Sequence, residues 1–352
     1  MKTDDAMPTD DTLQTYDVIA TLGPARRSED HWTAVLDAGA NRCRLNTSHM
    51  TIAETGSWVD ALREFLEATD RPDVGIVLDL QGSKWRIGPI RPITVEAGDR
   101  LTLSAGEDGE DATVIPVPHE AFFRAVEASN GEVRLNDGKV ILKVSGRGSA
   151  GRANPPVDDR SIEATVVRGG PLSGGKGITV PGTEHRNEGL GEKDRELLSR
   201  WCGRTAFAVS YVKDAVEMER FRGEAGPEAV LIAKLERQSA LADVEGIVAY
   251  TNELWLCRGD LGAELGFAEM AAAVRRFRPI RTVPSILAGQ VLEHMTEHPT
   301  PTRSEVCYLY DALHAGFRGV VLSDETAVGQ YPIEACRTAS LFRPVPPSSE
   351  RS

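Results

Sequence analysis

The chain has 352 residues, 41% of them hydrophobic, which is enough to bury a large core and is ordinary for a globular enzyme. Its formal net charge of −13, with no local basic patch, argues against nucleic acid and anionic membranes as partners. There is no signal peptide and no apolar run that could span a bilayer, and the five scattered cysteines lack metal-binding spacing, so we expect a cytoplasmic protein with reduced thiols.

Strands and helices alternate at the start of the chain, after a polar stretch (residues 1–15) that we expect to be a disordered tail. Three apolar runs predict strands, at residues 17–22, 41–45 and 74–78. Helical patterns lie between them, and the second helix is opened by the capping-box pair Thr51 and Glu54. Strand and helix therefore alternate from the first strand to the third.

A different pattern covers residues 88–177. Apolar and polar residues alternate around Leu101 and Leu103, and the turn sequence 136–138 (Asn-Asp-Gly) separates two further alternating runs. Hairpins without helices imply a small antiparallel β domain inserted into the chain. Lys176 lies in a glycine-rich stretch at the exit of this domain.

The alternation of helix and strand then returns. Five more apolar runs predict strands, at residues 206–209, 230–233, 254–257, 284–288 and 319–322. Eight strands separated by helical patterns favour a closed (β/α)8 TIM barrel. An open doubly wound sheet is the alternative, but it would concentrate polar clusters at one switch point, whereas here they follow nearly every strand. We expect the barrel to span 16–87 and 178–343, with 88–177 as a small β-barrel lid and 344–352 as a tail.

Charged residues end two neighbouring strands of the second half. Lys234 and Glu236 follow the fifth predicted strand, and Arg258 and Asp260 follow the sixth. Parallel strands present such charges at the same end, where carboxylates suit a divalent cation with oxygen ligands and a lysine suits a phosphate or a developing enolate. The alternative interpretation is that these charges are simply solvated.

Several ordered motifs lie between residues 17 and 339. They include ATLGPA (20–25), RLNTSH (44–49), LDLQGSKWRIG (78–88), GKGITVPG (175–182), AKLE (233–236), RGDLGAE (258–264), PTPTRSE (299–305) and LSDETAVGQYPIEA (322–335). Together, in this order, these motifs resemble those of pyruvate kinases. The resemblance implies a barrel with an inserted lid. It also implies phosphoryl transfer between a nucleotide (ADP or ATP) and an enol or hydroxy carboxylate such as phosphoenolpyruvate or pyruvate, with Mg²⁺ or Mn²⁺.

The resemblance also implies roles for individual residues. They are Lys234 and Arg44 in catalysis, Gly259, Asp260 and Gly289 in substrate binding, Glu236 and Asp260 as metal ligands, and Asn46, His49, Arg86 and Lys176 in nucleotide binding. Lys234 would stabilise the transferring phosphoryl group and the enolate oxygen. Backbone N–H groups at 259 and 260, where a short helix is expected to begin, would bind the substrate carboxylate.

One departure from the family pattern concerns the monovalent cation. Members that require one have Thr, Lys and Glu where this chain has Leu80, Gln81 and Lys84. An ammonium group beside the active site can supply the charge of K⁺ permanently. We therefore expect Lys84, near Asp79 and Ser48, to substitute for the ion, with no requirement for K⁺.

A second departure is Gly289, which stands where the family has a threonine against the methyl side of pyruvate. The replacement removes a hydroxyl and is expected to open space. Either the protonation step or the three-carbon substrate differs in this chain, or water supplies the proton and nothing else changes.

The chain ends where the family's C-terminal effector domain would start, so we expect no control through that domain and a monomer or homodimer. Two other functions stay open: a metal-dependent enolate lyase or aldolase acting on a pyruvate-like substrate, and a non-catalytic binding derivative. Retention of costly charges in one pocket, with Lys176 in the lid, favours the phosphotransferase.

Overall fold

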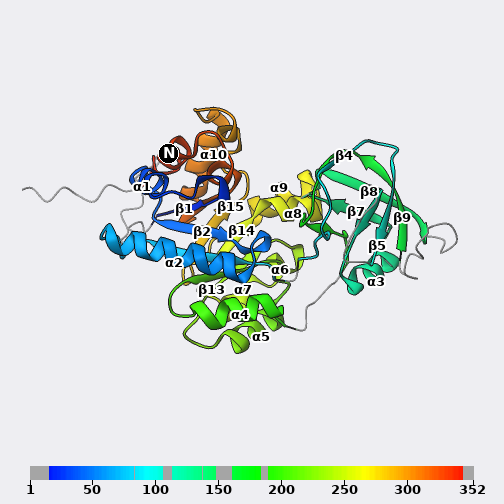
Figure 1. The fold of residues 1–352 in the computed structure, drawn as a ribbon, viewed down its shortest axis with the longest axis horizontal. Coiled ribbons are helices and arrows are strands. Elements are labelled where there is room, and N and C mark those ends of the chain that lie inside the picture. Colours follow the sequence, from blue (N-terminus) through cyan, green and yellow to red (C-terminus); the bar gives the residue numbers. More distant parts are fainter. Residues whose placement is uncertain are drawn as a thin grey trace, which may run out of the picture.

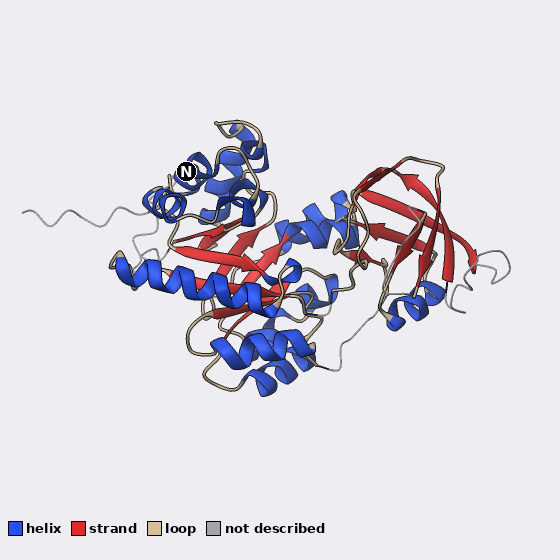
Figure 2. Ribbon diagram, viewed as in Figure 1, coloured by secondary structure: helices blue, strands red, loops and turns tan. Residues whose placement is uncertain are grey.

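Eight parallel strands close into a barrel in the computed structural model, which describes residues 16–82, 84–105, 113–136, 138–147, 161–183 and 189–343 (Figures 1 and 2). Around the barrel the order is β1-β16-β15-β14-β13-β12-β3-β2. The strands are β1 (Asp17–Thr21), β2 (Arg42–Asn46), β3 (Gly75–Leu80), β12 (Ala206–Val209), β13 (Val230–Leu235), β14 (Glu253–Cys257), β15 (Ser285–Ala288) and β16 (Gly319–Leu322). The predicted TIM barrel is confirmed.

Helices cover the outside of the barrel. They are α1 (Glu29–Asp37), α2 (Ile52–Ala68), α4 (Glu192–Trp201), α5 (Ala215–Ala225), α6 (Gln238–Ala242), α7 (Val244–Ile247), α8 (Arg258–Leu265), α9 (Phe267–Arg276), α10 (Arg303–His314), α11 (Asp324–Ala327) and α12 (Pro332–Ala339). The predicted capping box of α2 is present, with Thr51 and Glu54 bonded reciprocally. None of the helices in the described ranges combines the length and apolar character that a bilayer crossing requires.

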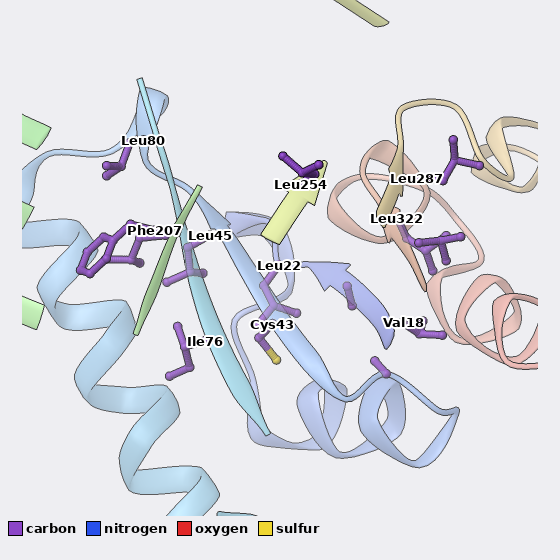
Figure 3. Close-up of a cluster of buried hydrophobic side chains, with 14 of the residues drawn as sticks. Val18, Leu22, Cys43, Leu45, Ile76, Leu80, Phe207, Leu254, Leu287 and Leu322 are labelled. Atoms are coloured by element: carbon purple, nitrogen blue, oxygen red, sulfur yellow. The ribbon is translucent and has the colours of Figure 1, made fainter. Parts of the chain in front are cut away.

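Barrel strands such as β3, β14 and β16 are buried on both faces, which is why their sequences read as continuous apolar runs, whereas β2 alternates buried and half-buried residues. One layer of side chains packs between strands and helices and includes Leu45, Phe207 and Leu254 (Figure 3). A second layer fills the barrel interior, with Ile232 and Trp255 among its members. Side chains alternate between these two layers along each strand, so residues two positions apart share a face.

The segment inserted after β3 forms separate sheets. A six-stranded curled sheet has the order β11-β7-β8-β9-β5-β6, and β4 pairs with β10. The strands are β4 (Ile93–Val95), β5 (Arg100–Ser104), β6 (Val114–Pro116), β7 (Glu132–Leu135), β8 (Val140–Arg147), β9 (Ser161–Arg168), β10 (Gly170–Leu172) and β11 (Ile178–Thr179). The aspartate at the centre of the predicted turn 136–138 lies outside the described residues.

The prediction that the inserted segment lacks helices is wrong. Helix α3 (Glu120–Ala128) lies between β6 and β7 and buries Phe122, Phe123 and Val126. Trp85, just after the barrel strand β3, meets Phe122 with ring centroids 5.8 Å apart. The helix therefore supplies part of the apolar core of the inserted sheet.

The inserted segment contacts the barrel at several places in the described part of the chain. Arg86 and Gly177, at the start and end of the insertion, form an antiparallel β-bridge. Farther along, Arg134 of β7 donates from Nη1 to the carbonyl oxygen of Ala263 in α8 at 2.6 Å. Figure 1 shows the inserted sheet next to α8, at the end of the molecule away from α1.

Candidate active site

Polar side chains gather inside the barrel at the carboxyl ends of its strands. Interior apolar residues occupy the middle of the strands, and the residues two positions later point the same way. Ile232 is one of these interior residues, and Lys234 lies two positions after it on the same strand. The side chain of Lys234 therefore projects into the barrel. The strand β13 extends to Leu235, two residues beyond the predicted 230–233, and Lys234 lies within it.

Lys234 is held between two carboxylates. Its Nζ lies 3.1 Å from Asp79 Oδ1 and 2.9 Å from Glu236 Oε1, and it also donates to Ser210 Oγ at 2.9 Å. Burial alone would lower the pKa of Lys234, but Asp79 and Glu236 outweigh it, so the pKa is raised. The group is a permanent ammonium, only 9% exposed, in the mouth of the barrel.

Asp79, 2% exposed, is the centre of this cluster. Arg44 Nε donates to its Oδ2 at 2.7 Å, and Ser210 Oγ donates to its Oδ1 at 3.1 Å. Burial would raise the pKa of Asp79, but the charges of Lys234 and Arg44 lower it to about 2. Asp79 is therefore ionised and orients both cations.

Arg44 is oriented by a second partner on the neighbouring strand. Its Nη1 donates to Thr21 Oγ1 at 2.7 Å. Thr21 is itself held by Thr326, whose hydroxyl accepts from the Thr21 N–H at 2.9 Å and lies 3.0 Å from the Thr21 carbonyl oxygen. These bonds link the first barrel strand to α11, the short helix that follows the last strand, beside the site.

Glu236, 1% exposed, is fixed through both of its oxygens. Oε1 meets Lys234, and Oε2 accepts the backbone N–H of Tyr211 at 2.7 Å. Tyr211 adopts φ +64°, a left-handed conformation that is strained for a bulky residue and often accompanies function. Its hydroxyl lies 2.8 Å from Thr179 Oγ1 in β11, so one residue touches both a buried carboxylate and the end of the inserted segment.

Asp260 lies in the first turn of α8 and forms an ion pair with Lys84. The sequence analysis placed Lys84 near Asp79 and Ser48, whereas in the structure Lys84 forms an ion pair with Asp260. Charge balance explains this placement, because the carboxylate of Asp79 already meets two cations and a hydroxyl, whereas Asp260 offers an acceptor at the base of the insertion.

The donor set suits a divalent cation. Glu236 and Asp260 offer carboxylate oxygens, the ligands that Mg²⁺ and Mn²⁺ prefer. Within the described residues, no three His, Cys, Asp or Glu side chains form a cluster. A cation held here would therefore complete its shell with water and substrate oxygens, as Mg²⁺ commonly does. The Lys84 ammonium on Asp260 and the Lys234 ammonium on Glu236 each hold a carboxylate of this set.

The amino terminus of α8 meets the loop after β15. Gly289, in that loop, adopts φ +82°, and a Cβ atom there would lie 3.0 Å from Gly259 N and 3.3 Å from Arg258 N. Arg258 Nε donates to the Gly289 carbonyl oxygen at 3.0 Å and holds the loop in place. A side chain at position 289 would therefore lie against the first backbone amides of α8. A carboxylate is favoured beside these amides because the amino terminus of a helix carries partial positive charge.

Of the predicted nucleotide-binding residues, Arg86 and Lys176 lie at the junction with the inserted segment, and Asn46 ends β2. Arg86 Nη1 donates to the carbonyl oxygen of Gly175 at 2.8 Å, next to half-buried Lys176. Its Nε is buried and has no hydrogen-bond partner among the described residues. Asn46 Oδ1 accepts from the Ser48 N–H at 3.2 Å. The side chain of His49 lies outside the described part of the structure.

The sequence analysis overlooked Thr21, Ser210 and Tyr211. A usable signal existed for the first two, because each follows an interior apolar residue by two positions: Ile19 and Ala208, respectively. No local signal marks the left-handed backbone of Tyr211, since aromatic residues rarely adopt it.

Comparison with known proteins gives consistent matches. The family model described as pyruvate kinase, barrel domain, matches residues 13–336. A pyruvate kinase of Agrobacterium vitis is 34% identical over 332 residues, which cover 90% of this chain and 65% of that protein. One of Mycobacterium intracellulare is 34% identical over 335 residues, covering 92% and 68%. One of Thermococcus litoralis is 30% identical over 329 residues, covering 90% and 66%. The chain thus spans about two thirds of the length of these relatives.

Proposed function

Because this chain belongs to the pyruvate kinase family, we propose that it is a phosphotransferase moving a phosphoryl group between ADP or ATP and an enol or hydroxy carboxylate such as phosphoenolpyruvate or pyruvate. The observation that carries the proposal is the buried ammonium of Lys234 between Asp79 and Glu236. Phosphoryl transfer requires fixed positive charge where negative charge develops. Lys234 would face the transferring phosphoryl group and the enolate oxygen.

The surrounding residues supply binding groups for a substrate of this class. Arg44 would contact the phosphoryl oxygens from its position on Asp79. The first amides of α8, at Gly259 and Asp260, would take the carboxylate, and Gly289 leaves them uncovered. Arg86, whose buried Nε–H has no hydrogen-bond partner among the described residues, suits a nucleotide phosphate.

The inserted segment supports a role as a lid over this site. Residues 88–177 leave and rejoin the barrel beside Lys176, which we assign to nucleotide binding with Asn46 and His49. A lid excludes water from the transferring group and so strengthens every charge in the pocket.

Glu236 and Asp260 would hold Mg²⁺ or Mn²⁺, which would neutralise phosphoryl oxygens. Lys84 supplies a fixed positive charge, so we propose that no K⁺ is needed. All five cysteines are free thiols, which supports a cytoplasmic location. We further propose a monomer or homodimer with small-molecule substrates.

The test is turnover of phosphoenolpyruvate and ADP with Mg²⁺, followed by coupled oxidation of NADH, and the reverse reaction with ATP and candidate acceptors. Lys234→Met is expected to lower kcat by about a hundredfold or more. Lys143→Met removes the same charge from an exposed position of the inserted sheet and is expected to leave kcat unchanged. Absence of nucleotide turnover in the parent chain, or its persistence in Lys234→Met, would contradict the proposal.

A further inference from the structure

The ion pair between Lys84 and Asp260 joins a proposed metal ligand to the base of the inserted segment. Lys84 is 7% exposed, so the pair is shielded from water. Screening by solvent is weak there, and the charges interact more strongly than a surface pair would. The contact is therefore strong enough to compete with another ligand of Asp260.

A divalent cation and the Lys84 ammonium would bind the same carboxylate, that of Asp260. Both are positive, so placing them together on Asp260 costs free energy in a site of low polarity. Glu236 cannot offer a fully open alternative, because its oxygens already meet Lys234 and the Tyr211 N–H. In the structure, the proposed metal ligand Asp260 is therefore bound by the ammonium group of Lys84.

Lys84 is also part of the junction between barrel and insertion. It directly precedes Trp85, whose carbonyl oxygen accepts the N–H of Ile178 at 2.8 Å. Its aliphatic stem crosses Gly177 so closely that a Cβ atom there would collide with Lys84 Cε. Lys84 therefore packs against Gly177, and movement of its side chain away from Asp260 changes a contact between the two segments of the junction.

We propose that Lys84 and the divalent cation compete for Asp260, so that metal binding releases Lys84 and loosens the junction of the inserted segment. This inference rests on the proposed function, which supplies the metal. The same helix, α8, receives Arg134 from the inserted sheet. Helix α8 therefore carries both the carboxylate that changes partner and a contact that sets the position of the sheet.

Titration of the whole chain with Mn²⁺ alone, read by electron paramagnetic resonance of the free ion, tests the competition without any turnover. Lys84→Met is expected to lower the Kd for Mn²⁺ by about tenfold, because a shielded competing charge is removed. Lys143→Met is the matched control and is expected to bind Mn²⁺ as the parent does. Glu236→Gln is expected to weaken binding in both backgrounds.

A second measurement uses the parent chain and does not depend on the folding of a variant. Pulse acetylation with mass spectrometry is expected to show that Mg²⁺ increases the labelling of Lys84 while that of Lys143 stays constant. Equal Mn²⁺ affinity of the parent and Lys84→Met, or labelling of Lys84 that does not respond to Mg²⁺, overturns the competition while leaving the proposed function standing. Absence of saturable Mn²⁺ binding in every protein overturns both.

Discussion

The Nζ atom of Lys234 lies 3.1 Å from Oδ1 of Asp79, and each group fixes the charge of the other inside the barrel. The pKa of Asp79 is lowered, whereas that of Lys234 is raised. Neither charge survives alone in such a site without a large cost, because removing one partner strands the other. The pair therefore contributes to stability and to chemistry together.

The first prediction concerns Asp79→Asn and pH. The pKa of Asp79 is about 2 in the folded chain against an ordinary 3.8, so its stabilising effect is full above pH 3.8 and is lost as pH falls toward 2. At pH 7 the variant is expected to lose on the order of 2 kcal/mol or more in free energy of unfolding. Urea unfolding across this pH range measures the difference.

A surface aspartate provides the control for that experiment. Asp37 pairs with Arg71 at 2.6 Å, and its side chain is 60% exposed. Asp37→Asn is expected to change the free energy of unfolding by less than about 1 kcal/mol. A difference between parent and Asp79→Asn that does not shrink from pH 4 to pH 2 would show that the ionised carboxylate is not the source of the stability.

The second prediction concerns the bond between Tyr211 and Thr179. Tyr211→Phe and Thr179→Val each remove one hydroxyl from the 2.8 Å contact between the barrel and β11. A double-mutant cycle is expected to give a coupling free energy of about 1 kcal/mol. Additive effects of the two substitutions on the free energy of unfolding would mean that the contact contributes nothing.

The third prediction compares two glycines with nearly the same backbone. Gly289 has φ +82° and Gly266 has φ +81°, so alanine at either position is expected to cost about 1 kcal/mol in stability. A Cβ at 289 would meet Gly259 N at 3.0 Å, whereas one at 266 would meet nothing within 4 Å. Only Gly289→Ala is therefore expected to raise KM for the carboxylate substrate, and equal KM values for the two variants would exclude the α8 amides from substrate binding.

The fourth prediction concerns monovalent cations. Lys84, Lys234 and Arg44 already place three fixed positive charges beside Asp79 and Asp260. These charges belong to side chains and, unlike a bound K⁺ ion, cannot be lost to solvent. The rate is therefore expected to be the same in KCl, NaCl and tetramethylammonium chloride of equal ionic strength. Steady-state assays in the three salts measure this, and strong activation by K⁺ alone would contradict it.

The barrel could be predicted because most of its strands read as continuous apolar runs and each is separated from the next by a helical pattern or, after the third, by the inserted segment. The missed helix α3 shows the limit of that approach. Its buried residues Phe122, Phe123 and Val126 have helical spacing, so the sequence does carry a signal for this helix. The alternating runs elsewhere in the segment led us to expect β structure throughout.

The site was predictable to the extent that motifs and strand ends reveal it. Lys234 and Glu236 share one strand end, so their proximity follows from the sequence. The partner of Lys84 does not follow, because Lys84 and Asp260 are 176 positions apart and meet only once the insertion is placed. Likewise, sequence revealed that Gly289 lacks a side chain but not that α8 begins beside it.

Thr326 forms hydrogen bonds with Thr21, which lies 305 positions before it, and Thr21 accepts a hydrogen bond from Arg44. The orientation of Arg44, near the start of the chain, therefore depends on a residue near its end. During synthesis on the ribosome, the early strands emerge long before that hydroxyl does. A nascent chain arrested before residue 326 would therefore carry every predicted catalytic residue while lacking part of the scaffold that orients one of them. The hydrogen bonds that orient Arg44 through Thr21 are therefore complete only after Thr326 has been synthesised.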